Sequence, residues 1–596
     1  MRLSIFLLLA AFAAQISDRP AVGQAVAPSA APVVAIKVDQ VGYRTAAPKV
    51  ALVAAQSPAS DFTVRRAAGG AVVFRGKLSA QTHDADTDDM VQAADFSALK
   101  TDGKYYVDVP GVGRSWEFSI GPDVYARAFY MAMRAFYGQR CGIAVDLAPD
   151  FPAYKHAACH LEGAWHPSSG KTGPRVSAKG WHDAGDYGRY TVNSGITTGT
   201  LLWAWELFSS HVKGVKLNIP ESGNKTPDIL NEIKWNLDWM LSMQDEDGGV
   251  WHKQTSAQFC GFIMPEKDTL VSYAIGTGKE PFKSSCATAD LAAVAAIAAR
   301  AYKPFQPDYA AECLRAARKA FAWVEKYPNV TFNNPQGVGT GGYGDGNCSD
   351  EHLWAAAELW RTTGESDYEK YFLAHYGDFK NAGGRGARGG GQPTAAPALI
   401  HATNPQGWGN VANLGLWTYV LGKGKDAAAV AAIRDDSLKA ADEIVRRTPL
   451  LPYHHSMTTG DYGWGSNSVA ANYGMQLLVA NAFKPNPRYV ETALDNLHYL
   501  LGRNTFSVSW VTQLGANPYK HPHHRPSGAD GIDDPWPGML SGGPNRSRQD
   551  PDMTKLLPAT YPPAKGWVDV QGAYAANEIA INWQAPLVFL LAGALK

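Results

Sequence analysis

The stretch GPDVYARAFYMAMRAFYGQR, residues 121–140, marks the point at which the pattern of apolar residues changes. Before it, apolar residues come in short runs of the kind that form strands. Within it they recur about every 3.6 residues, and this helical pattern continues, with interruptions, to the end of the chain. The sequence therefore predicts an all-β domain followed by an all-α domain.

Short β-type runs fill residues 33–121, from VVAIKV and KVALVAA to KYYVDV and SWEFSI. Gly, Asp, Pro or Ser turns separate them, which favours antiparallel strands joined by tight connections. We expect a small β-sandwich of the immunoglobulin-like kind over residues 33–121.

Residues 122–596 hold about a dozen candidate helices. Many carry Ala where a neighbouring helix could pack closely, and no clear repeat relates them, so a solenoid and a closed ring are both open. Long Gly/Pro-rich loops over 327–349, 380–408 and 503–568 divide them, and loops of that length are usually functional. Beyond the first, the predicted helices are 189–209, 226–244, 286–303, 308–326, 350–363, 409–421, 425–447, 466–482, 486–502 and 571–595.

Composition bounds the class of protein. The 596 residues are 45% hydrophobic and 11% aromatic, enough for a large core and more than one domain. Lys+Arg and Asp+Glu number 55 each, and no long run of one sign occurs. This balance argues against nucleic acid or an anionic membrane surface as partner and favours a neutral one.

The first residues, MRLSIFLLLAAFAA, place one arginine before a short apolar run. The run is shorter than the roughly 20 residues that a bilayer needs, which favours a secretory signal over a membrane span. We expect a signal peptide over 1–25, a linker over 26–32, and export to the periplasm or the medium. A retained anchor is the alternative.

The segment GWHDAGDYGRY, residues 180–190, places Asp183 and Asp186 three residues apart. The intervening glycine permits a tight bend, and two close carboxylates repel unless water, a cation or hydrogen bonds hold them. The alternative reading is an N-cap or turn pair at the start of the next helix.

Near the end of the chain, Glu578 in YAANEIAINWQAPLV opens a mostly apolar helical run. Burial there would keep the carboxyl protonated and able to donate to a leaving group. A glutamate stabilised by the helix dipole, with a lowered pKa, is the alternative. In GANPYKHPHHRPSG, His523 and Arg525 lie in a proline-bounded loop and suit hydrogen bonds to sugar hydroxyls or to a carboxylate, although such residues are more often surface or capping groups.

Taken together, KGWHDAGDYGRY, LGANPYKHPHHR and YAANEIAINWQAPLV resemble, in this order, motifs of glycoside hydrolase family nine, the inverting β-1,4-glucanases. Other helical segments, such as YGWGSNSVAANYG, are also similar. VDQVGYRTAAPKVALV is similar to the immunoglobulin-like module that precedes the catalytic domain in one branch of the family. The resemblance implies an (α/α)6 barrel of twelve helices, and hence a closed ring.

Residue roles follow from the resemblance. It implies that Asp186 is the general base, that Asp183 helps to hold the attacking water, and that Glu578 is the general acid with a raised pKa. Inversion requires roughly 6.5–9.5 Å between the acid and base carboxyl groups. His523, Arg525 and Tyr574 would contact the sugar next to the scissile bond.

The implied activity is endo-acting hydrolysis of cellulose or a soluble β-glucan. An exo-acting cellobiosidase and an exo-β-glucosaminidase on the same fold remain alternatives, which the shape of the loops over 327–349 and 380–408 would decide. A noncatalytic carbohydrate-binding protein is disfavoured by the intact acidic set. No cofactor is expected for the chemistry.

Two cysteines and two histidines near the first motif form a candidate zinc set: Cys141, Cys159, His160 and His182. These are ligands of a closed structural site, which leaves no open position for a zinc-bound water. In an exported protein a disulfide between the two cysteines is the alternative. Some family members with the same arrangement carry such a site, and zinc here would fix the loop bearing the aspartates through His182. The remaining cysteines, Cys260, Cys286, Cys313 and Cys348, are predicted as buried thiols.

Asp350 and Glu351 in GDGNCSDEHLW resemble a calcium loop of the family, since calcium prefers oxygen ligands. An ordinary acidic pair at a helix start is equally consistent with these residues.

Overall fold

The computed structural model describes residues 31–380 and 397–595. The signal peptide predicted for 1–25 lies outside the described residues, as do most of the predicted linker and part of the loop over 380–408. No helix within the described residues is long and apolar enough to cross a membrane.

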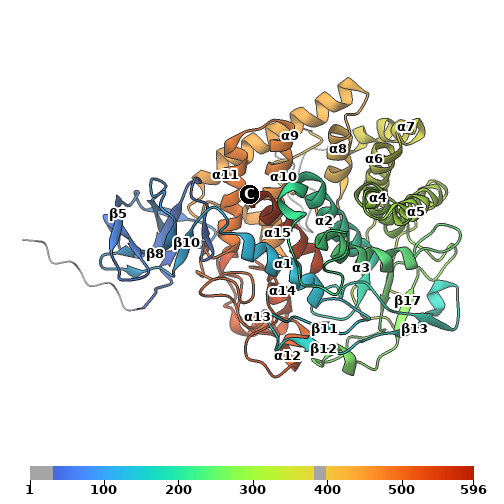
Figure 1. The fold of residues 1–596 in the computed structure, drawn as a ribbon, viewed down its shortest axis with the longest axis horizontal. Helices are drawn as coiled ribbons and strands as arrows, with labels where there is room; N and C mark the ends of the chain where they lie inside the picture. The colour runs from blue at the N-terminus through green and yellow to red at the C-terminus, as the bar shows by residue number, and fades with distance from the viewer. Residues whose placement is uncertain (1–30, 381–396, 596) are drawn as a thin grey trace, which may run out of the picture.

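The N-terminal domain is a β-sandwich that lies to one side of the helical domain (Figure 1). One sheet has the order β1-β3-β7-β6 and the other β2-β10-β8-β4-β5, with β9 paired to β8. The strands are β1 Ile36–Lys37, β2 Gly42–Tyr43, β3 Val50–Ala54, β4 Asp61–Arg66, β5 Val72–Lys77, β6 Thr82–Asp84, β7 Asp89–Asp95, β8 Gly103–Val109, β9 Gly113–Arg114 and β10 Phe118–Ile120.

Aromatic rings fill the space between the two sheets. Tyr43 lies edge-on to Phe96 and to Phe118, with ring centroids 5.3 Å apart in both pairs. All three side chains are buried, as alternation of inward and outward residues requires in a sandwich. The sequence pattern missed β6 and β7, because the Asp-rich segment THDADTDDM conceals their alternation.

The helical domain is a closed double ring, as the family resemblance implied. Among the described residues, each inner helix contacts the next, and the last contacts the first. The inner helices are α2 Thr191–Val212, α4 Ser285–Tyr302, α6 Ser349–Thr363, α8 Ala412–Leu421, α10 Ser466–Phe483 and α15 Ile581–Ala594. The outer helices are α1 Ala126–Gly138, α3 Asp228–Ser242, α5 Pro307–Lys326, α7 Ser366–His375, α9 Ala427–Arg447 and α11 Pro487–Leu500.

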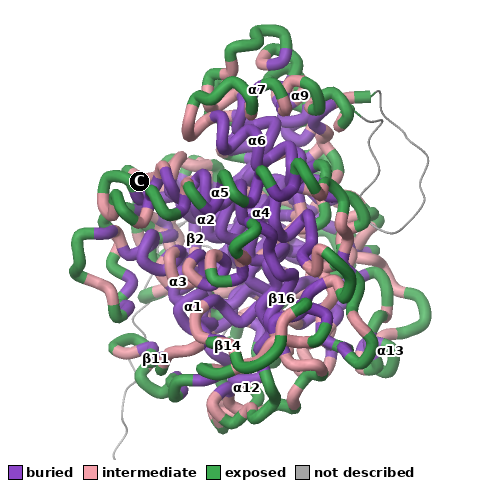
Figure 2. The backbone as a smooth tube through the Cα atoms, turned by 90° about the vertical axis from the view of Figure 1, so that its right-hand side faces the viewer, coloured by how far each residue is buried: buried purple, intermediate pink, exposed green. Residues whose placement is uncertain are grey.

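Side-chain size explains which helices lie inside. The first fifteen residues of α4 are all buried, and small alanines allow its neighbours to approach closely. In α2, a Cβ at Gly199 would lie 2.5 Å from the Trp354 ring of α6, so only glycine permits this contact. Figure 2 shows the buried segments gathered around α2 and α4, with exposed segments at the periphery. Among the outer helices, α5 and α9 bury one stripe, as amphipathic helices do.

Buried polar groups join the two domains. Asp39, which follows β1, contacts His498 Nδ1 of α11 at 2.8 Å and accepts a hydrogen bond from the Tyr125 hydroxyl at 3.2 Å. The Gln40 amide group donates to the carbonyl of Ser507 at 2.8 Å. The sandwich is therefore held firmly against the helical domain.

Three local predictions differ from the structure. The helix predicted over 571–595 is wrong in its first part: α14 spans only Tyr574–Asn577, Glu578 is extended with φ −67° and ψ 155°, and α15 begins at Ile581. Helix α7 was not predicted. The third loop carries two short helices, α12 Arg525–Ala529 and α13 Pro551–Leu556.

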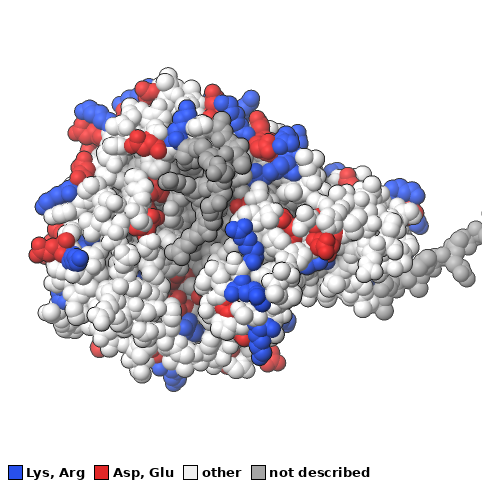
Figure 3. All heavy atoms as spheres, turned by 180° about the vertical axis from the view of Figure 1, so that it is seen from behind, with Lys and Arg blue, Asp and Glu red and all other residues white. Residues whose placement is uncertain are grey.

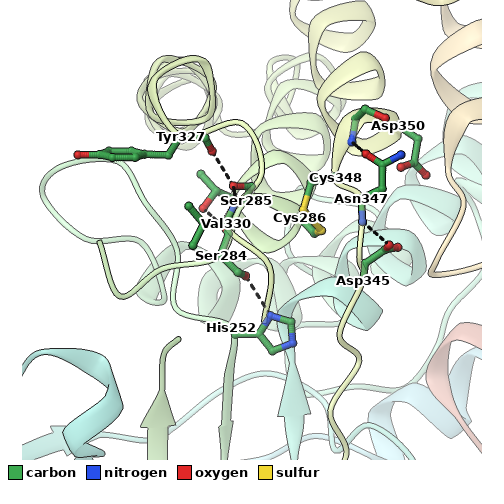
Figure 4. The surroundings of a disulfide bond; sticks show 12 residues. His252, Ser284, Ser285, Cys286, Tyr327, Val330, Asp345, Asn347, Cys348 and Asp350 are labelled. Atoms are coloured by element: carbon green, nitrogen blue, oxygen red, sulfur yellow. Dashed lines mark hydrogen bonds between the residues drawn. A yellow bond between two sulfur atoms is a disulfide. The ribbon is translucent and has the colours of Figure 1, made fainter. Parts of the chain in front are cut away.

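The prediction of free thiols is wrong for one pair of cysteines. Cys286 of α4 and Cys348, immediately before α6, form a disulfide (Figure 4). Cys313 is a buried thiol and Cys260 a half-buried one. The spacing of Cys286 and Cys348 gave no signal, because their approach depends on the packing of adjacent inner helices.

Candidate active site

A cleft of ≈ 960 Å³ opens on the helical domain, and every catalytic and sugar-binding residue predicted from the sequence lines it. Figure 3 shows a hollow on this face with acidic side-chain atoms at its base. The predicted residues that the structure brings together are Asp183, Asp186, His523, Arg525, Tyr574 and Glu578.

Backbone hydrogen bonds hold three distant segments together at the floor of the cleft. Ala184 pairs with Ala580 in an antiparallel bridge, and His523 pairs with Glu578 in a parallel one. A Cβ at Gly185 would lie 2.0 Å from the carbonyl oxygen of His523. The glycine of DAGD therefore permits the close approach of the aspartate loop to the segment that carries His523 and Glu578.

Each aspartate has its own hydrogen-bond donors. Asp186 Oδ2 accepts from the Gly188 backbone N–H at 2.9 Å and from the Tyr190 hydroxyl at 3.1 Å. Asp183 accepts from Asn193 Nδ2 at 2.5 Å and from the Tyr343 hydroxyl at 2.7 Å. Donors of this kind favour the ionised carboxylate.

Burial favours the protonated form of Asp183. Burial, together with the charge of Asp186, raises the pKa of Asp183 to about 8. Two ionised carboxylates repel, so the charge of Asp186 disfavours ionisation of Asp183.

The surroundings of Glu578 favour the protonated form of its carboxyl group. Burial raises its pKa well above the usual value, and the charges of Asp186 and Asp183 act in the same direction. Because Glu578 is extended and precedes α15, it does not occupy the first turn of a helix, where the dipole would favour ionisation. The carboxyl group therefore tends to keep its proton at the cleft wall.

The predicted sugar-binding residues surround Glu578. His523 Nδ1 lies 2.8 Å from the carbonyl oxygen of Gln571, which fixes the imidazole. Arg525 donates from Nη1 to the Gly185 carbonyl at 2.7 Å and from Nε to the Cys260 carbonyl at 3.1 Å. The Tyr574 ring lies 5.6 Å from that of His523. Arg525 therefore braces the aspartate loop as well as lining the cleft.

Sequence reasoning missed several residues of the site. Tyr190 and Asn193 follow the DAGD motif closely, and their polar groups next to two acids were a readable signal. Tyr343 lies in the glycine-rich loop over 327–349, and no pattern linked it to Asp183. Trp464, which is 46% exposed, lies 5.6 Å from the Tyr574 ring and adds an aromatic face to the cleft.

The four predicted metal ligands come together beside the aspartate loop. One ligand atom from each of Cys141, Cys159, His160 and His182 lies within 4.8 Å of all the others. The Sγ of Cys159 is 3.7 Å from Nε2 of His182, and tetrahedral zinc places its S and N ligand atoms about 3.3–3.8 Å apart. Both cysteines are free thiols, so the alternative of a disulfide between them is not what the structure has.

His160 is oriented as a metal ligand would be. Its Nε2 lies 3.3 Å from a carboxylate oxygen of Asp268, whereas its buried Nδ1 has no hydrogen-bond partner. A carboxylate that holds the far nitrogen of a ligating histidine is the usual arrangement around metal sites. The residues therefore fit a metal ion, and His182 would connect it directly to Asp183.

Asp350 and Glu351 lie in the first turn of α6, but they are not an ordinary exposed acidic pair. Asp350 is 5% exposed and Glu351 is fully buried, and both neighbour Asp290 and Asp345. Burial and these neighbours raise the pKa of Glu351 well above its usual value. The carboxylate oxygens of Glu351 and Asp290 have no hydrogen-bond partner. Figure 4 shows Asp345 and Asp350 beside the disulfide.

Comparison with known proteins agrees with the geometry. The chain is 40% identical over 563 residues to Endoglucanase D of Acetivibrio thermocellus, which covers 94% of this chain and 83% of that protein. It is 34% identical over 596 residues to the xyloglucan-specific endo-beta-1,4-glucanase BoGH9A of Bacteroides ovatus, with 93% of each chain covered.

A solved structure described as a Zn-binding triple mutant of the GH family 9 endoglucanase J30 superposes with a TM-score of 0.83 at 35% identity. It covers 93% of this chain and 99% of its own. The profile of the cellulase N-terminal ig-like domain matches residues 31–114, and that of glycosyl hydrolase family 9 matches residues 125–591. With the acidic cleft inside the second of these regions, the chain belongs to glycosyl hydrolase family 9 and is a glycoside hydrolase with an N-terminal immunoglobulin-like domain.

Proposed function

We propose that this glycoside hydrolase is an endo-β-1,4-glucanase that cleaves cellulose or a soluble β-glucan with inversion of configuration. The observation that carries the proposal is the contrast among the carboxyl groups in one cleft. Donors stabilise Asp186 as a carboxylate, whereas burial keeps the proton on Glu578. A base and an acid held apart in protonation state are what glycosidic hydrolysis needs.

In the proposed reaction, water attacks the anomeric carbon from the face opposite the leaving oxygen. Asp186 takes a proton from this water, and Asp183, fixed by Asn193 and Tyr343, orients it. As the C–O bond to the leaving sugar breaks, Glu578 transfers its proton to the departing oxygen. One displacement inverts the anomeric carbon, and the two carboxyl groups exchange one proton each with the substrates.

Aromatic and cationic groups would position the sugar chain. Tyr574 and Trp464 present rings to the cleft, and pyranose faces stack on such rings. His523 and Arg525 lie next to Glu578 and are placed to hydrogen-bond the sugar that precedes the cleaved bond. The name Endoglucanase D of the relative described above supports endo action.

The stereochemical proposal is tested by proton NMR of fresh product from carboxymethylcellulose or cellooligosaccharides. We expect the α-anomer to appear first, and Asp186→Asn to remove nearly all activity with the fold intact. Early β-anomer, or an active Asp186→Asn variant, contradicts the assignment. Product profiles separate the endo reading from an exo-acting cellobiosidase or an exo-β-glucosaminidase, since only endo action lowers polymer viscosity early.

We further propose that the metal held by Cys141, Cys159, His160 and His182 is zinc. Two thiolates and two imidazoles form a complete tetrahedral set, and the similar J30 structure is described as Zn-binding. The ion would stabilise the loop that carries Asp183 through its neighbour His182 and would take no part in the chemistry. Elemental analysis of the purified protein that finds no zinc would contradict this.

A calcium ion at Asp350 and Glu351 stays a proposal, supported by the unpartnered carboxylate oxygens there. Asp290 and Asp345 would complete an oxygen-rich set of the kind calcium prefers. Calcium added after chelator treatment should raise the melting temperature, and no shift would argue against a site.

Export through a signal peptide is likewise proposed. The Cys286–Cys348 disulfide supports it, because disulfides persist mainly in oxidising compartments. Mass spectrometry of the protein recovered outside the cytoplasm should give a mature N-terminus near residue 26; a retained Met1 would contradict the cleavage.

A further inference from the structure

Lys253 is a buried cation behind the cleft wall. It lies on β16, Lys253–Thr255, and none of its surface is exposed. Its Nζ donates to Asn334 Oδ1 at 2.7 Å, to the Gly341 carbonyl at 2.6 Å and to Thr340 Oγ1 at 3.1 Å. Every one of these acceptors is neutral. Burial accordingly lowers the pKa of Lys253 to about 7, although the charge of Asp186 opposes the shift.

A buried ammonium group without a contacting carboxylate is a costly way to stabilise a fold. Among the described residues, Lys253 forms no ion pair within 4.0 Å. A neutral side chain of similar volume would avoid the desolvation. The position of its acceptors indicates what the lysine does instead.

Two of the three acceptors of Lys253, Thr340 and Gly341, lie on the wall segment, residues 339–343, which lines the cleft. His252, the preceding residue, contacts the next carbonyl of this segment, with Nε2 2.8 Å from the oxygen of Gly342. Its ring stacks on Phe332 at 3.7 Å and its Nδ1 lies 3.0 Å from Ser284 Oγ (Figure 4). Two adjacent side chains thus fix two consecutive carbonyls of the wall segment.

The wall segment ends at Tyr343, the donor to Asp183. Tyr343 has a backbone φ of 44°, which is uncommon for a bulky residue and must be held by its surroundings. Its hydroxyl donates to Asp183 at 2.7 Å, and its ring lies 4.8 Å from that of Tyr190, the donor to Asp186. The carbonyls that His252 and Lys253 hold are those immediately before this strained residue.

We propose that Lys253 is a positioning residue for the paired aspartates: by fixing the wall segment it holds Tyr343 in its strained conformation and so sets the orientation of Asp183. The inference rests on the proposed function, in which Asp183 and Asp186 act on one water. Lys253 itself does not touch the substrate or the water.

The test measures kcat and KM on a cellooligosaccharide for Lys253→Met, Tyr343→Phe and the double variant. We expect Lys253→Met to lower kcat by about 10- to 100-fold, the effect of a small misplacement of a reacting group. KM should change little, because the aromatic faces of the cleft remain. In the Tyr343→Phe background, Lys253→Met should cost no more than about two-fold, because residues that act through one contact are not additive.

Lys49→Met is the matched control. Lys49 is equally unexposed and its Nζ also donates to neutral acceptors, the carbonyls of Thr45 and Ala47, but it lies in the β-sandwich. It should lose stability and keep kcat. A Lys253→Met variant with the kcat of the control, or losses that multiply in the double variant, would overturn the inference.

Asn334→Ala covers the case in which Lys253→Met does not fold. Asn334 accepts from Lys253 and donates to the Thr340 carbonyl at 2.7 Å. We expect a several-fold loss of kcat that disappears in the Tyr343→Phe background, and a loss that persists there in full refutes the inference. Asp186→Asn distinguishes failure of the positioning role from failure of the proposed function: if it abolishes activity while Lys253→Met leaves kcat unchanged, only the positioning role fails.

Discussion

Replacing Glu578 by glutamine tests the core of the proposed chemistry. Gln has nearly the same shape and keeps the backbone bridge between residue 578 and His523, so the fold should remain. What is lost is the proton that burial and the two aspartates keep on the carboxyl group. A positioned general acid contributes roughly 10²–10⁴-fold, or about 3–5 kcal/mol of transition-state stabilisation.

We expect the upper part of that range on a polymeric substrate. A sugar hydroxyl is a poor leaving group, and the Gly188 and Asn193 donors already bond to Asp186 and Asp183. The loss should therefore be about 10³–10⁴-fold in kcat on carboxymethylcellulose.

The decisive assay uses 2,4-dinitrophenyl β-cellobioside, whose phenolate leaves without a proton. Glu578→Gln should lose less than about 10-fold on this substrate, since general acid assistance is not needed there. Asp186→Asn, which removes the base, should be inactive on both substrates. Equal losses of Glu578→Gln on both substrates, or full activity on the polymer, would refute the assignment of the acid.

The pH profile gives an independent reading of the same residue. Glu578 works in its protonated form, and its pKa is raised, so activity should persist above the usual range of a glutamate and fall as pH rises through the raised pKa. On carboxymethylcellulose, whose leaving group needs the proton, the residual activity of Glu578→Gln should lack this alkaline limb. A limb of unchanged position in the variant would assign it to another group.

Two further predictions concern the supports of the site. Asp268→Asn should weaken metal retention by about 10- to 100-fold in competition with a chelator, because it removes the carboxylate that orients His160. Asp378→Asn is the control, since Asp378 forms an exposed pair with His375. Equal metal retention in both variants would contradict the role of Asp268. Replacing Cys286 and Cys348 by alanine should lower the free energy of unfolding by up to about 4 kcal/mol, from the entropy of a closed loop of this length. Urea denaturation measures that loss, and an unchanged midpoint would show that the disulfide does not stabilise the fold.

The sequence predicted the features that depend on a local pattern, namely the fold class of each domain and the motifs of the cleft. The change from strand to helical spacing near residue 121 predicted an all-β domain followed by an all-α one, which is the fold class of the structure. The three family motifs contain the predicted residues that line one cleft. Closure of the ring came from the family resemblance, because no repeat in the helices distinguishes a ring from a solenoid. The extended conformation of Glu578 was missed, since the apolar residues around it fit a helix equally well.

Contacts between residues on different helices or loops could not be predicted from the sequence. Cys286 and Cys348 are 62 residues apart and meet only because α4 and α6 are adjacent in the ring. Tyr343 reaches Asp183 from a loop without periodicity, and Lys253 looks like an ordinary basic residue in VWHKQ. In each case the partner lies on another element, which a single sequence does not reveal.

The position of α15 in the inner ring has a consequence for biosynthesis. Residues 578–594 supply both the proposed proton donor, Glu578, and the last inner helix of the barrel, α15, which lies between α10 and α2. A ribosome makes these residues after every other wall helix, so the nascent chain has neither a complete cleft nor cover for the apolar flanks of α2 and α10. Cellulolytic activity should therefore switch on only when synthesis of the catalytic domain is finished, and messages truncated shortly before codon 578 should yield inert, aggregation-prone polypeptide rather than a weakened enzyme.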